Sequence, residues 1–191
     1  MSEPLPATFR VKVRIRSERT SAPVRIELDA LCHSETKALL AYWQDMRHDR
    51  NMPAPSDFDP AAVRGLLPHI SLIEVLPGPP PDYLFRVEGE AIKSALGVAR
   101  MGRRLSDFRT DMGARYRSIV SSYEAACVER APIAVRTTPR FAGRNYAAME
   151  ILKLPLSQDG KTVNRLLCAY CFTGAPEAAL GAKVRPLAFE G

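Results

Sequence analysis

Residues 133–173 read IAVRTTPRFAGRNYAAMEILKLPLSQDGKTVNRLLCAYCFT, which is three apolar stretches separated by two turn sequences. The turns contain Gly143-Arg144-Asn145 and Asp159-Gly160, residue types that adopt the backbone conformations of tight hairpins. Apolar stretches of this length between turn signals are typical of strands. We therefore predict an antiparallel meander of three strands, at residues 133–141, 146–156 and 162–173.

Two more strands and a helical middle are predicted before the meander. The apolar run 70–76 ends in a proline-rich loop, and residues 83–88 alternate up to Gly89, so these two strands should pair. Residues 90–97 predict a brief helix. Asp111 can cap a longer helix, whose apolar residues recur at helical spacing: Tyr116, Ile119, Val120, Tyr123 and Cys127.

The N-terminal part combines a possible hairpin with two helices. Residues 9–16 alternate apolar and basic side chains, and residues 24–28 repeat that period, which is compatible with a hairpin in an extension over residues 1–30. Ser34 can cap a helix that runs to about residue 47. Asp59 and Pro60 predict a short helix that stops at residue 68.

This order of elements predicts an α+β domain over residues 31–174, followed by a tail at 175–191 that carries no strong pattern. Its core is expected to be a five-stranded antiparallel sheet with the helices packed on one face. Such an arrangement leaves a cavity between the sheet and the helical middle.

The chain resembles a bacterial PAS-like family, whose members are single sensory domains preceded by a helix. The residues that carry this resemblance are Leu40-Ala41-Tyr42-Trp43, Met52-Pro53-Ala54, Phe58-Asp59-Pro60, Leu66-Leu67-Pro68-His69, Phe85-Arg86-Val87-Glu88-Gly89, Gly97, Gly102, Leu105, Leu154-Pro155-Leu156-Ser157 and Asp159-Gly160. The resemblance implies a PAS-type fold and a signalling role. PAS domains bind haem, flavin, small metabolites or proteins, and the fold does not select among them, so the cofactor is unknown.

Composition and charge fit an ordinary globular domain. The chain has 191 residues, of which 46% are hydrophobic and 25% charged. No apolar run reaches the roughly 20 residues of a membrane span, and residues 1–6 lack the layout of a secretion signal, so a cytoplasmic protein without a membrane partner is expected. The four cysteines are expected to be free thiols.

Five residues are candidate ligand-binding residues: Trp43, His69, Arg86, Tyr116 and Tyr123. The aromatic side chains either line a pocket or pack in the core. His69 either faces a pocket or forms a hydrogen bond with the backbone at the end of a strand. Arg86 requires a carboxylate or a bound anion if it faces inward; otherwise it forms a surface pair with Glu88 or a cross-strand acid.

Metal binding and catalysis are not predicted. Cys168 and Cys171 have the spacing of a zinc or redox pair, which Cys32 and His33 would complete, but on a strand an odd separation places them on opposite faces. The sequence contains no phosphate-binding glycine loop, nucleophile elbow or HExxH motif. We therefore expect a non-catalytic domain that binds a small ligand or a protein partner for signal output.

Two further expectations concern partners. The apolar face of residues 9–15 needs a cover, which a second copy would supply, so a homodimer is favoured. The alternative function is nucleic-acid binding by basic clusters at residues 10–19 and 100–109, in a chain whose formal charge is +6. It is disfavoured because no recognition helix or RNA-binding aromatic strand is visible.

Overall fold

The structure, a computed structural model, describes residues 22–138, 140–141, 144–146 and 148–174. The strand predicted at residues 9–16, the basic cluster at 10–19 and the tail at 175–191 lie outside this range. The strands are β1 (Val24–Ile26), β2 (Ile70–Leu76), β3 (Asp82–Glu88), β4 (Ile133–Thr137), β5 (Arg140–Phe141), β6 (Arg144–Asn145), β7 (Ala148–Leu156) and β8 (Arg165–Thr173). The α-helices are α1 (Ser34–Arg47), α2 (Glu90–Leu96), α3 (Arg109–Met112) and α4 (Tyr116–Glu129). The 3-10 helices are η1 (Leu28–Ala30), η2 (Pro55–Asp57), η3 (Arg64–His69), η4 (Leu105–Phe108) and η5 (Gly113–Arg115).

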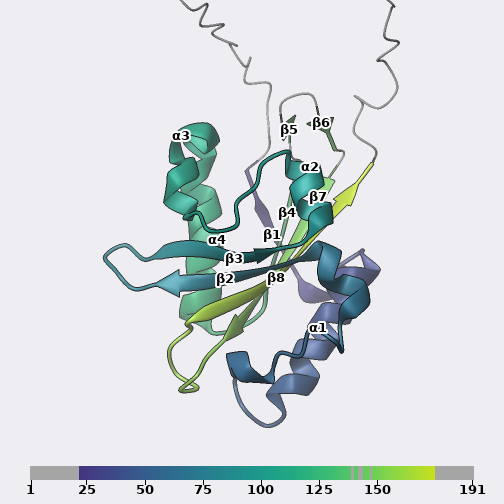
Figure 1. Cartoon of the computed structure of the whole chain (residues 1–191), viewed down its shortest axis with the longest axis vertical. Helices are drawn as coiled ribbons and strands as arrows, with labels where there is room; N and C mark the ends of the chain where they lie inside the picture. The colour runs from purple at the N-terminus through teal and green to yellow at the C-terminus, as the bar shows by residue number, and fades with distance from the viewer. Residues whose placement is uncertain (1–21, 139, 142–143, 147, 175–191) are drawn as a thin grey trace, which may run out of the picture.

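The main sheet has six strands in the order β1-β4-β7-β8-β2-β3, and every neighbouring pair is antiparallel (Figure 1). The α+β class and the antiparallel sheet are confirmed. The sheet has one strand more than predicted, because β1 adds to the edge of β4, with Val24 opposite Arg136. β5 and β6 form a separate two-stranded sheet between β4 and β7, so β4 ends at Thr137 rather than continuing to residue 141.

The two central strands, β7 and β8, are buried along most of their length. Their side chains alternate between two covered faces. On β7, Ile151 and Lys153 face a cavity beneath α4, whereas Glu150 faces the start of α1. A strand that is covered on both faces reads as a nearly continuous apolar run, as 151–156 does.

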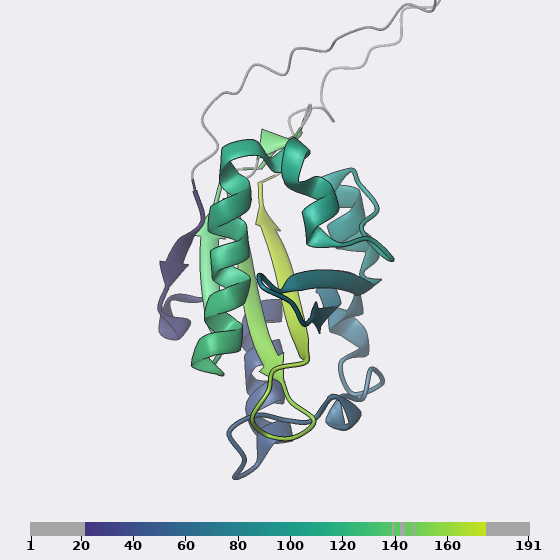
Figure 2. The ribbon, with the colours of Figure 1, turned by 90° about the vertical axis from the view of Figure 1, so that its left-hand side faces the viewer.

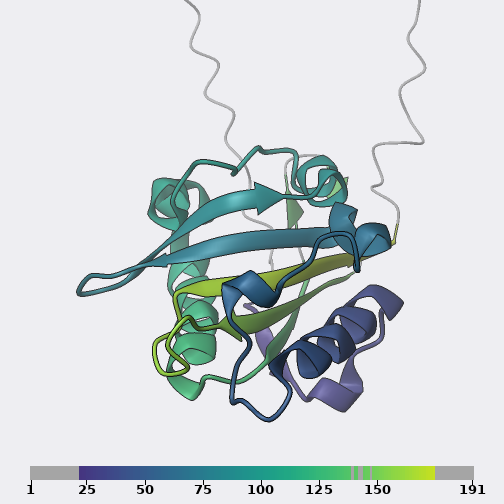
Figure 3. The same ribbon diagram turned by 60° about the horizontal axis from the view of Figure 1, so that its bottom comes forward.

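Helices cover both faces of the sheet, in contrast to the one-sided packing that the sequence predicted. Figure 2 shows α4 in front of β4 and β7, with α1 behind the sheet, and Figure 3 shows α1 along the other face. α1 buries Leu39, Trp43 and Met46, and Trp43 Nε1 donates a hydrogen bond to the Pro155 carbonyl at 2.9 Å. β7 thus separates two packed layers.

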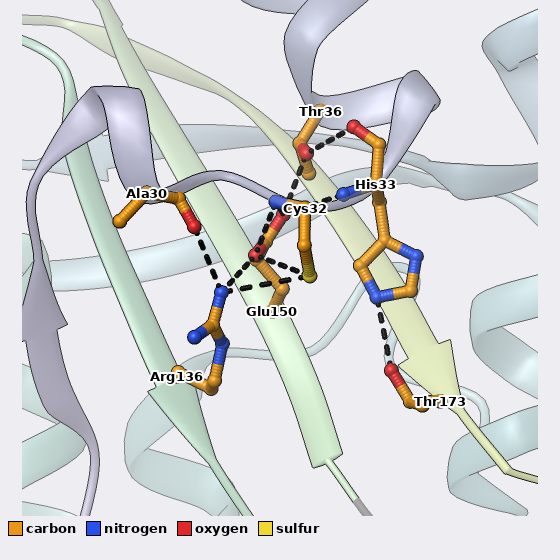
Figure 4. A network of polar contacts seen from close by, with 7 residues as sticks. All are labelled: Ala30, Cys32, His33, Thr36, Arg136, Glu150 and Thr173. Carbon is orange, nitrogen blue, oxygen red and sulfur yellow. Dashed lines mark hydrogen bonds and ion pairs between the residues drawn. The ribbon is translucent and has the colours of Figure 1, made fainter.

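The N-terminus of α1 is held by a carboxylate from the sheet (Figure 4). Glu150, 1% exposed, accepts hydrogen bonds from the Cys32 and His33 amides at 3.1 and 3.4 Å and from the Thr36 hydroxyl at 2.7 Å. Arg136 on β4 forms an ion pair with it at 2.8 Å. The prediction that Ser34 caps this helix is wrong: Ser34 is the first helical residue, and its hydroxyl donates to Glu35.

These contacts keep Glu150 ionised. Burial opposes its negative charge, but the hydrogen bonds from Thr36, Arg136 and Cys32 outweigh burial and lower its pKa to about 2. An anion at a helix N-terminus is also favoured by the helix dipole. Glu150 therefore joins α1, β4 and β7 through charge as well as packing.

The helical middle differs from its prediction in where the helices begin. α4 starts at Tyr116 rather than after Asp111, because Gly113, with φ of 54°, interrupts the helical backbone. The short helix expected from residue 60 forms later, as η3. In the described part of the chain, no helix combines the length and apolarity needed to cross a membrane.

Candidate functional site

A cavity of about 240 Å³ lies between the sheet and the helical segments 96–123. Most of its wall is apolar, supplied by side chains such as Leu105, Phe108, Ile119, Val135, Met149 and Ile151. β4, β7 and β8 form its floor, α4 and η4 form its sides, and Pro23 before β1 reaches its edge. An apolar hollow with a few polar groups is the usual form of a small-molecule site.

Lys153 contributes its side chain to the wall of this cavity, and its ammonium nitrogen is buried. Its side chain extends from β7, is 1% exposed, and its Nζ lies 5.0 Å from the centre of the Tyr123 ring. Within the described residues, Nζ has no hydrogen-bond partner. Burial lowers the pKa of Lys153 to about 8, opposed by the adjacent thiol of Cys168. At neutral pH the group is thus mainly charged, in surroundings that disfavour the charge.

Two tyrosine hydroxyls meet beside this lysine. The Tyr123 and Tyr170 oxygens are 2.6 Å apart and both residues line the cavity. Burial raises the pKa of both phenols, so they stay protonated. One hydroxyl donates to the other, which leaves the second hydroxyl hydrogen free to reach an acceptor in the cavity.

A buried ion pair lies next to the tyrosines. Arg100 Nε donates to Glu88 at 2.5 Å, and the two side chains are 7% and 3% exposed. The guanidinium carbon lies 4.3 Å from the centre of the Phe85 ring and 4.9 Å from that of Tyr170. Arg100 is thus neutralised by Glu88 and withdrawn from the predicted basic cluster at residues 100–109.

Of the five candidate residues from the sequence, Tyr123 lines the cavity. Trp43 packs on the opposite face of the sheet with α1. His69 Nδ1 lies 3.2 Å from the Tyr170 carbonyl, at the start of β2. Arg86 pairs on the surface with Glu74 of the neighbouring strand, which is the cross-strand alternative considered above. Tyr116 lies at the start of α4 against Arg109.

The polar residues that sequence reasoning missed are Lys153, Arg100 and Tyr170. Lys153 did give a signal, because it is the one charged residue in the apolar stretch 151–156 of a strand predicted to be buried. Arg100 gave none, since its partner Glu88 is distant in sequence and the residue resembled part of a solvated basic run.

Other features of the described residues lie apart from this cavity. A groove of about 650 Å³ between η3, β2, β3 and α2 is more open to solvent and is lined mainly by apolar side chains such as Leu67, Leu72 and Val87. On the α1 face, candidate metal-ligand atoms of His33, Glu35 and Cys171 lie within 4.8 Å of one another.

Cys168 and Cys171 do point to opposite faces. Cys168 lies beside Lys153 and Arg100, whereas Cys171 lies near Glu35 and Glu150. The two thiols therefore cannot bind one ion together without distortion of β8, as the alternation of a strand predicts.

A family model described as a PAS domain matches residues 31–171. Searches of curated proteins and of solved structures gave no match.

Proposed function

The chain belongs to the PAS domain family, and on this premise we propose that it is a non-catalytic sensory module that binds a small molecule in the cavity beside Lys153. The observation that supports ligand binding most strongly is the buried ammonium of Lys153, which has no partner among the described residues. Buried charges are normally paired, so this group favours an occupant that supplies the partner.

The proposed signal passes from the cavity through β7 to α1. Ile151 and Lys153 line the cavity, whereas Glu150 of the same strand bonds to Thr36 of α1, so a shift of β7 changes both layers. A second route is the edge strand β1, since Pro23 borders the cavity and Arg25 forms a two-pronged ion pair with Glu129 at the end of α4. A ligand that binds one arrangement more tightly shifts the population toward it.

The size of the cavity bears on the choice of ligand. Its volume of about 240 Å³ falls below the roughly 300–1,000 Å³ typical of drug-sized sites. A small metabolite therefore fits better than haem or flavin, which are at least as large as drug-sized ligands. The nucleic-acid alternative loses support, because burial with Glu88 makes Arg100 unavailable to phosphates.

Blocking the cavity is expected to abolish ligand binding. Ile119→Trp places an indole in the space, whereas Val128→Trp on the same helix changes a residue that is 79% exposed. Native mass spectrometry of protein purified from cells should show extra mass on the wild type and on Val128→Trp, and none on Ile119→Trp. If no mass is retained, a thermal-shift screen of metabolites takes its place.

The screen must give shifts that Ile119→Trp removes and Val128→Trp preserves. Absence of both retained mass and such shifts would overturn the ligand-binding proposal.

The same native mass spectra report the oligomeric state of the protein. We propose a homodimer that presents its surface to a protein partner. A purely monomeric mass at micromolar concentration would contradict the homodimer and would leave the ligand-binding proposal unaffected.

A further inference from the structure

The charges around the cavity do not balance. Its described lining contains the charged residues Arg100, Asp111, Arg115 and Lys153. Arg100 is neutralised by Glu88, and Asp111 is exposed. Arg115, in η5, is only partly buried, so water can reach it. The deepest of these charges, Lys153, has no hydrogen-bond partner within the described ranges.

The atoms near Lys153 determine what an occupant must offer. The ammonium supplies three donors and no acceptor, and the tyrosine pair supplies one hydrogen that the pair itself does not use. An occupant that accepts hydrogen bonds and carries one negative charge satisfies both. Most of the remaining wall is apolar, so most of the rest of the occupant must be apolar as well.

The volume limits the length of that apolar part. A cavity of about 150 Å³ holds a benzene molecule, and a water molecule takes roughly 30 Å³ in the liquid. By the second measure, about 240 Å³ accommodates on the order of eight non-hydrogen atoms. This corresponds to a carboxylate carrying a short alkyl chain or a single aromatic ring.

We propose that the cavity binds a small amphipathic carboxylic acid, whose carboxylate pairs with Lys153 and the Tyr123–Tyr170 hydroxyls while its hydrocarbon part fills the apolar space. This inference rests on the proposed function, because it assigns the ligand class of the same cavity. The carboxylate neutralises the buried ammonium, and the hydrogen-bonded pair forms out of water, where such contacts are stronger than on the surface.

The matched probes are hexanoate and its uncharged amide, hexanamide, which have nearly the same shape. Binding of each probe is titrated at pH 7 and followed by amide chemical shifts in NMR spectra. The wild type is expected to bind hexanoate at least about tenfold more tightly than hexanamide, a difference that corresponds to one charge-assisted hydrogen bond. Ile119→Trp should bind neither probe.

Lys153→Met and Lys153→Gln remove the charge and should remove the preference for the acid. The control is Lys93→Met, which changes a half-exposed lysine on α2 and should leave the preference intact. If the ammonium is unpaired without ligand, Lys153→Met should also raise the melting temperature of the free protein by several degrees. A lysine with only a structural role would give the opposite shift and no change in acid preference.

The outcomes separate this inference from the broader proposal. Equal affinity for acid and amide, or an acid preference that survives in both Lys153 variants, would overturn the acid assignment and leave the cavity as a ligand site. Binding of neither probe, together with the negative metabolite screen described above, would overturn both. A tenfold preference lost in Lys153→Met and kept in Lys93→Met would support both.

Discussion

Replacing Glu150 by glutamine is expected to lower the free energy of unfolding by about 3 kcal/mol at pH 7. The carboxylate is 1% exposed and accepts hydrogen bonds from Cys32, His33 and Thr36, in addition to the ion pair with Arg136. Glutamine has a similar shape but brings a neutral amide, whose NH₂ group faces donors rather than acceptors. This loss of stability lies near the lower end of the range for breaking a buried ion pair, because the Arg136 side chain is 37% exposed and can be hydrated.

The effect of Glu150→Gln should depend on pH. The pKa of Glu150 is lowered from 4.5 to about 2, so its stabilising contribution is fully present above pH 4.5 and is lost as the pH falls towards 2. Urea unfolding at pH 7 and pH 3 should therefore show a larger difference between wild type and variant at pH 7.

The control for this prediction is Glu129→Gln, which breaks the exposed pair with Arg25 and should change stability little. A Glu150→Gln variant as stable as the wild type at pH 7, or equally destabilised at both pH values, would show that the charge of Glu150 does not hold α1 to the sheet.

Replacing Gly89 by alanine is expected to cost about 3 kcal/mol or more, or to prevent folding. Gly89 lies between β3 and α2, and its amide donates to the Ile70 carbonyl at 2.8 Å. A Cβ atom at this position would lie 2.2 Å from the Pro68 carbonyl oxygen and 2.3 Å from that of Leu67. Because both contacts are with backbone, η3 and β3 would have to move apart.

Gly65→Ala is the matched control, since Gly65 lies in the same η3 segment and an added Cβ would meet nothing within 4 Å. The urea midpoints and soluble yields of the two variants give the comparison. Gly89→Ala with the stability of Gly65→Ala would mean that the close approach of η3 to β3 is not a constraint on the fold.

The sheet could be predicted from the sequence because its strands are marked locally. The turn at Asp159-Gly160 and the apolar runs on either side of it predicted β7 and β8 to within a few residues. The face that α1 covers could not be predicted in the same way. The apolar stripe of Leu39, Trp43 and Met46 indicates that one side of the helix is buried, and it carries no information on which face of the sheet it meets.

The candidate site was less predictable than the fold, because it depends on pairings between distant residues. Tyr123 was recognised from helical spacing, but its hydroxyl partner Tyr170 lies on another element. Arg100 and Glu88 became a pair only once β3 and the following connector were brought together. Lys153 could be recognised in the sequence as the charged residue within the apolar stretch 151–156. Whether such a lysine has a partner depends on the tertiary structure.

The two opposite charges of β7 also bear on how this strand finds its place between β4 and β8. Side chains that are apolar on both faces specify strand alignment weakly, because a slip of one residue exchanges one apolar set for another. Here the same slip would turn Lys153 towards the face that α1 covers and Glu150 towards the apolar cavity. Glu150 would then lose its ion pair with Arg136 and its hydrogen bonds to α1, so misaligned sheets are penalised and a single pairing of β7 with its neighbours is selected during folding.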